Sequence, residues 1–147
     1  MILSKNARRS LVEWNPQSDR ILLARFRTPA RNICIVQCYA PTEVADMERK
    51  ENFYEEFNRT LMKIHRGGTI MLMGDFNAKV GDKNEGCERI MGKHGMGTKN
   101  INGELFLELC LEHDIVIGGT IFPFKDIHKI TWVSPDLQTQ NQIDHIA

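Results

Sequence analysis

The sequence lacks any apolar run long enough to cross a membrane. No stretch approaches the ~20 apolar residues of a transmembrane helix, and the first residues lack the apolar segment of a secretory signal. A surplus of basic residues is also missing, because 19 lysines and arginines balance 19 acidic residues. Zero net charge argues against a protein that coats nucleic acid nonspecifically. It remains compatible with an enzyme that contacts only a few phosphates.

The cysteines show no sign of a disulfide framework or a metal site. The four of them form no CxxC pair and no close cluster with the five histidines, which argues against bound zinc. Cys34 and Cys38 fall on one predicted strand, where their Cα atoms would be ~13 Å apart, too far for a disulfide. We therefore expect reduced, buried thiols in an intracellular protein.

What is present fits one folded domain over residues 1–147. Hydrophobic residues make up 41% of the chain, too many for a disordered segment of such low net charge. A chain of this length can bury a core of its own. The sequence contains no internal repeat, low-complexity tract or linker that would divide it.

Apolar periodicity predicts strands interspersed with two helices. Strands are expected at 20–26, 32–39, 69–73, 115–117, 130–133 and 142–146, and helices at 47–65 and 102–112. The first two strands should form a hairpin buried on both faces, and the last two should pair around 134–136. Asp46 and Asn102 are the expected N-caps, Leu105 and Leu109 should point inward, and residues 78–101 form a long loop. This order favours a layered α/β or α+β domain.

Polar side chains stand at or near the ends of three predicted strands. Tyr39 ends one strand, Asp75 and Asn77 follow another, and Asp144 lies within a third. In an extended segment Asp75 and Asn77 point the same way and could share one ligand. A carboxylate there could take a proton from water, and an amide could donate to a phosphate oxygen.

Each of these residues also has a purely structural interpretation. A lone tyrosine at a strand end is typical of packing at a rim, and a Gly-Asp turn after a strand is common. Asp144, between Ile143 and His145-Ile146, must be paired or must face water, because a buried unpaired carboxylate is costly.

Four ordered blocks resemble those of a single family: Cys38–Thr42, Met73–Ala78, Thr131-Trp132 and Gln142–Ile146. They look like the endonuclease/exonuclease/phosphatase superfamily, which has a DNase I-like fold. Within it, the blocks at 90–104 and 117–120 are similar to the apurinic-type endonuclease domain of non-LTR retrotransposons and to the host-encoded craniofacial development protein 2-like group. The resemblance covers nearly the whole chain and implies a DNase I-like two-sheet sandwich with flanking helices.

The resemblance implies Mg²⁺-dependent phosphodiester hydrolysis, with Mn²⁺ as a substitute, and DNA nicking as the reaction. Asp75 would orient or deprotonate the attacking water, and it is the one candidate metal ligand. Asn77 and Tyr39 would contact the phosphate, and Asp144 would fix the tautomer of a histidine. A DNA substrate would also imply a nuclear location.

The sequence also departs from the family pattern. We expect the family's metal-binding glutamate to lie before the start of this chain and its terminal Ser-Asp-His block to lie beyond Ala147. Glu13 does not stand in the glutamate motif, and His145 should point away from Asp144. We therefore expect an incomplete sandwich with unpaired strand edges and weak or no activity.

Two other functions stay open from the sequence. One is a non-enzymatic interaction module with the same fold. The other is a phosphoesterase of the same superfamily that acts on RNA or inositol phosphates.

Overall fold

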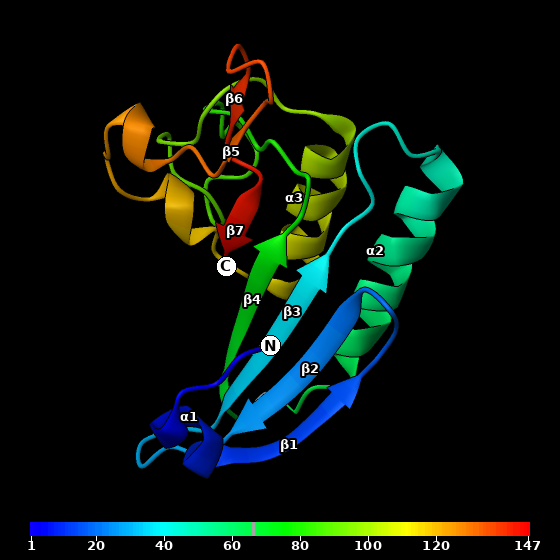
Figure 1. The fold of residues 1–147 in the computed structure, drawn as a ribbon, viewed down its shortest axis with the longest axis vertical. Helices are drawn as coiled ribbons and strands as arrows, with labels where there is room; N and C mark the ends of the chain where they lie inside the picture. Colours follow the sequence, from blue (N-terminus) through cyan, green and yellow to red (C-terminus); the bar gives the residue numbers. More distant parts are fainter. Residues whose placement is uncertain (66) are drawn as a thin grey trace.

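The computed structural model describes residues 1–65 and 67–147 as a sheet with helices packed on one face (Figure 1). The elements in chain order are α1 (Lys5–Ser10), β1 (Leu11–Pro16), β2 (Ile21–Phe26), β3 (Ile33–Tyr39), α2 (Met47–Met62), β4 (Thr69–Asp75), α3 (Ile101–His113), η1 (Gly118–Thr120), η2 (Asp126–His128), β5 (Trp132–Val133), β6 (Gln140–Asn141) and β7 (Asp144–Ile146). The fold is mixed α/β, as the sequence predicts. No helix of the described residues could cross a bilayer.

The main sheet has five strands in the order β1-β2-β3-β4-β7, and β5 and β6 form a separate two-stranded sheet. The predicted hairpin is confirmed, because β2 and β3 pair antiparallel. β3 and β4 pair parallel, with α2 as the crossover between them. β1 and β7 are the edge strands among the described residues.

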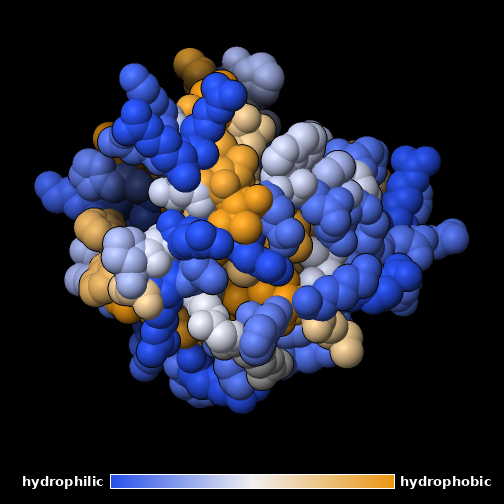
Figure 2. All heavy atoms as spheres, turned by 90° about the horizontal axis from the view of Figure 1, so that it is seen from below, coloured by the Kyte–Doolittle hydropathy of each residue, from blue (hydrophilic) through white to orange (hydrophobic). Residues whose placement is uncertain are grey.

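The core lies between this sheet and the two long helices. Val36 and Leu72 from neighbouring strands are fully buried, as are Phe57 of α2 and Phe106 of α3. The predicted burial of both sheet faces holds only in part. Ala24 and Phe26 are buried on the face opposite the helices, whereas Ile35, the register partner of Ala24, is only partly buried. The helices cover one face only. On the opposite face Leu22 lines a shallow apolar groove with Met1, Leu3, Leu11 and Trp14, and hydrophobic residues gather at the α1 end of the molecule (Figure 2).

The two long helices are close to their predicted positions. Asp46 caps α2 as expected, since its Oδ1 accepts from the Arg49 amide at 2.8 Å. The N-cap of α3 is Asn100 rather than Asn102, because the Asn100 side chain accepts from the amides of Gly103 and Lys79. Asn102 lies inside the helix and is fully buried, with its Nδ2 donating to the Pro41 carbonyl.

The inward face of α3 also differs from the prediction. Leu109 is 4% exposed, but Leu105 is only partly buried, because Phe106 and Cys110 occupy the centre of the helix face that contacts the core. The centre of the buried helix face therefore lies one residue further along the chain than predicted, at Phe106 and Cys110 rather than at Leu105 and Leu109.

One predicted strand and one predicted strand pairing are wrong. Residues 115–117 form no strand, because Ile115 donates to the end of α3 and Ile117 donates to the Ile90 carbonyl in a loop. The segment 142–146 does not pair with 130–133. Instead, β5 pairs with β6, and β7 joins β4 in the main sheet. The Thr131 hydroxyl accepts from the amides of Ile143 and Asp144, both at 3.1 Å, where the chain turns into β7.

Candidate active site

Three neighbouring strands place Tyr39, Asp75 and Asp144 in one row. Tyr39 pairs with Asp75 in the parallel register of β3 and β4, and Asp75 pairs with Asp144 in the antiparallel register of β4 and β7. Register partners project from the same face of a sheet. The structure thus brings together three of the four predicted site residues, and their chemical roles stay a prediction.

Asn77 joins this row through a tight turn after β4. Its amide donates to Asp75 Oδ1 at 2.8 Å, and its Nδ2 donates to the Ala40 carbonyl at 3.0 Å. Its φ of 48° is left-handed, so the extended segment expected from the sequence is wrong at this residue. Asparagine tolerates this conformation and commonly bonds locally in turns. Among the described residues, the second Nδ2 hydrogen and the Oδ1 atom have no partner, so both can contact a ligand.

Tyr39, Asp75 and Asn77 line one open cavity of about 410 Å³. The Tyr39 side chain is exposed, so its hydroxyl is accessible. The remaining lining residues are Thr42, Glu43, Val44, Lys79, Asn100, Trp132, Asn141 and Ile143. The cavity thus combines carboxylate, amide, hydroxyl and ammonium groups.

Lys79 is the one cationic residue among the described residues that line this cavity, and it is not among the predicted site residues. A signal for it was present in the segment from Asp75 to Val80. Phe76, Ala78 and Val80 are buried, whereas the residues between them are only partly buried. This alternation of buried and partly buried residues continues past the end of β4, and it places Lys79 on the same side as Asp75 and Asn77. An ammonium group beside the row suits an anionic ligand.

The environment of Asp75 favours its protonated form more than water does. Partial burial raises the pKa of the Asp75 carboxyl, the Asn77 amide lowers it, and the negative charge of Asp144 raises it further. The net pKa is above the ordinary value for aspartate. A carboxylate with a raised pKa beside a second carboxylate is typical of sites that handle protons or bind a cation.

The donor types fit a hard divalent cation only in part. Carboxylate and amide oxygens are the ligands that Mg²⁺ accepts in proteins, and Asp75, Asp144 and Asn77 Oδ1 offer them. However, the part of the chain that the structure describes contains no group of three acidic, histidine or cysteine residues arranged to hold a metal. These residues would supply part of a coordination shell.

Glu13 lies away from the site. It forms an ion pair with Arg25, with Nη1 and Oε1 3.1 Å apart, and Arg25 pairs in register with Cys34 of β3. Cys34 precedes Tyr39 by five residues, which is about 17 Å along a strand. Leaving Glu13 out of the ligand set therefore agrees with its position.

His145 points away from Asp144, as predicted. Its ring is 4% exposed and lies in the core, with Nε2 2.7 Å from the Ala78 carbonyl oxygen, whereas Asp144 is exposed. None of the histidines in the described residues lines the cavity. The histidine that Asp144 would orient is therefore not supplied by this part of the chain.

No family model matches the sequence. Almost the whole chain is similar to part of two curated proteins of one kind. The chain is 32% identical over 146 residues to craniofacial development protein 2 of Bos taurus. It is 30% identical over 146 residues to craniofacial development protein 2 of Tragulus javanicus. The matches cover 99% of this chain, which spans about a quarter of the length of either relative, 24% and 25%.

The fold is similar to that of a solved endonuclease domain. The endonuclease domain of TRAS1, a telomere-specific non-LTR retrotransposon, superposes with a TM-score of 0.63 and 19% sequence identity. The superposition covers 92% of this chain and 52% of that one. Identity this low shows a shared fold and carries no function across. The chain therefore has the DNase I-like fold that the resemblance implies, and almost all of its sequence is similar to craniofacial development protein 2.

Proposed function

We propose that this site serves divalent-cation-dependent hydrolysis of a phosphodiester bond in DNA. The observation that carries the proposal is the row of Tyr39, Asp75 and Asp144 across three paired strands, with Asn77 and Lys79 beside it. Strand ends of a rigid sheet hold side chains in fixed relative positions, which hydrolysis of a charged substrate requires.

Each residue has a role that its surroundings favour. Asp75, whose pKa is raised, would accept a proton from the attacking water. The free Nδ2 hydrogen of Asn77 and the Tyr39 hydroxyl would donate to oxygens of the scissile phosphate. Lys79 would offset the negative charge that develops on that phosphate.

A divalent cation would offset the negative charges of Asp75, Asp144 and the bound phosphate. Asp75, Asp144 and Asn77 Oδ1 would be its protein ligands, and the cation would act as a Lewis acid on a phosphoryl oxygen. The described residues offer too few metal ligands, and no histidine lines the cavity. We therefore expect this chain by itself to nick DNA slowly or not measurably. In a longer protein that carries it, a DNA substrate would imply work in the nucleus.

Nicking of supercoiled plasmid tests the proposal. The full chain is incubated with Mg²⁺ or Mn²⁺ beside Asp75→Asn, with Asp82→Asn as the control because Asp82 is an exposed aspartate outside this cavity. Loss of a general base costs about 10²–10⁴-fold in rate. We expect any nicking to need the cation, to vanish in Asp75→Asn and to persist in Asp82→Asn.

Two results would contradict the proposal. One is nicking that is equal in the two variants. The other is the absence of nicking from a longer chain that includes the flanking segments of the relatives.

A further inference from the structure

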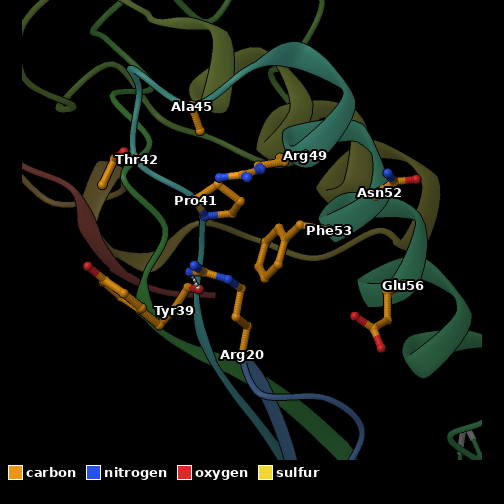
Figure 3. Close-up of a pocket in the computed structure, with 9 residues that line it drawn as sticks. All are labelled: Arg20, Tyr39, Pro41, Thr42, Ala45, Arg49, Asn52, Phe53 and Glu56. Atoms are coloured by element: carbon orange, nitrogen blue, oxygen red, sulfur yellow. Dashed lines mark hydrogen bonds between the residues drawn. The ribbon is translucent and has the colours of Figure 1, made fainter.

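A second cavity lies on the other side of Tyr39 from the Asp75 site. Its volume is about 380 Å³, and it is formed by Arg20 just before β2, the end of β3 with the connection that follows, and the first turns of α2 (Figure 3). Tyr39 and Thr42 line both cavities. The two cavities are therefore adjacent, with the exposed Tyr39 ring between them.

Two arginines from different elements dominate this second cavity. In Figure 3 the Arg49 side chain crosses above Pro41, the Arg20 side chain rises to Tyr39, and the Phe53 ring lies between them. Arg20 Nη1 donates to the Tyr39 carbonyl oxygen at 3.1 Å, and its guanidinium carbon is 5.5 Å from the centre of the Tyr39 ring. Both contacts hold the guanidinium in place without neutralising it.

The positive charge of the pair is only weakly offset. None of the ion pairs among the described residues involves Arg20. Arg49 pairs through Nε with Asp46 at 3.3 Å, an exposed contact that stabilises little and leaves its terminal nitrogens free for a ligand. Of the described residues that line the cavity, Glu56 is the one acidic residue, and it lies away from both guanidinium groups (Figure 3).

We propose that the Arg20–Arg49 pocket binds a backbone phosphate of a nucleic-acid strand, next to the phosphate held at the Asp75 cavity. This proposal rests on the proposed function for the identity of that neighbouring site. Arginine presents a planar fork of donors that matches phosphate oxygens. A nucleic-acid strand carries a phosphate at every nucleotide, so a strand bound on one side of Tyr39 presents the next phosphate to the other side. A small phosphomonoester could occupy either cavity but could not extend from one cavity into the other.

Binding of a fluorescent single-stranded oligonucleotide tests the pocket separately from catalysis. Anisotropy is measured on the full chain in EDTA for Arg49→Gln and Arg20→Gln. Arg59→Gln is the matched control, because Arg59 is an exposed arginine of the same helix that lines neither cavity. Loss of a charged hydrogen bond to phosphate should weaken binding about tenfold. The slope of log Kd against log salt should fall by about one in each pocket variant.

The possible results test phosphate binding by this pocket independently of the proposed hydrolysis. Binding that depends on Arg49 but not on Arg59 supports the pocket, even if no plasmid is nicked. Equal effects of Arg49→Gln and Arg59→Gln would overturn it, even if nicking is robust. Inorganic phosphate should compete far less well than the oligonucleotide at equal phosphate concentration, and equal competition would also overturn the proposal. Arg20→Gln could also disturb Tyr39, because Arg20 donates to its carbonyl oxygen. Arg49 is exposed, so Arg49→Gln should leave the fold intact and provides the test on its own.

Discussion

Protonation of the buried His145 ring should destabilise the fold as the pH falls. The ring lies against Phe76 and Phe106, with ring centroids 6.2 and 5.4 Å away. A carbonyl oxygen can only accept, so Nε2 carries the proton and donates to Ala78 at 2.7 Å. Nδ1 is buried without a partner among the described residues. Burial lowers the pKa of His145, and the Ala78 carbonyl and the charge of Asp144 oppose this only in part.

The sign and size of the effect follow from proton linkage. The unfolded chain takes up a proton on this histidine near its ordinary pKa of about 6.5, and the folded chain does so only at lower pH. Between these two pKa values the unfolded state binds more protons, so the free energy of unfolding falls as the pH falls. The slope is about 1.4 kcal/mol per pH unit, which gives a loss of up to about 2 kcal/mol between pH 6.5 and pH 5.

Urea unfolding followed by circular dichroism measures this loss at several pH values. His145→Gln is the informative variant, because its amide can still donate to Ala78 but does not titrate. Subtracting its profile from that of the unsubstituted chain cancels the carboxylates common to both. His128→Gln, at an exposed histidine, should keep the original profile. Identical profiles for the unsubstituted chain and His145→Gln would refute the reasoning, since the folded ring would then bind its proton as readily as the unfolded one.

Two further substitutions test how the site is held. Gly74→Ala should destabilise the fold by more than about 3 kcal/mol in the same urea assay, because the new Cβ would lie 2.1 Å from the Cys38 carbonyl oxygen at a φ of 142°. Gly86→Ala, also at positive φ but with nothing within 4 Å, should cost about 1–2 kcal/mol, and equal losses would contradict the steric argument. Glu43→Gln should cost about 1–3 kcal/mol, because Glu43 faces the buried Lys50 ammonium at 3.6 Å. An unchanged unfolding midpoint would show that Lys50 needs no counter-charge.

The placement of the candidate site residues could be predicted from the sequence better than the strand pairing around them. Asp75 and Asn77 directly follow a buried apolar strand, and Tyr39 ends another, so local pattern and family resemblance pointed to the same residues. The edge strand β1 was missed because Val12, Glu13 and Trp14 are all exposed, which leaves no alternation to detect.

The C-terminal strands could not be predicted from local pattern for a different reason. Which strand a short apolar segment pairs with depends on contacts far along the chain. The Asp144 amide donates to the Thr131 hydroxyl at the start of β7, and β7 then pairs with the edge of β4 that β3 leaves unpaired. A buried apolar segment such as 115–117 likewise looks like a strand until its backbone partners are known.

The position of Asp75 in the row depends on the register of β4. A slip of one residue would turn Asp75 to the opposite face of the sheet. The register is fixed on both sides of β4, because Ala40 donates to the Asp75 carbonyl at 2.8 Å and Phe76 donates to the Ile143 carbonyl at 3.0 Å. Phe76 is fully buried, so rotating Asp75 inward would expel this ring from the core. The same apolar packing that stabilises the fold therefore holds the polar row in place, and any phosphate chemistry here uses positions set by the core.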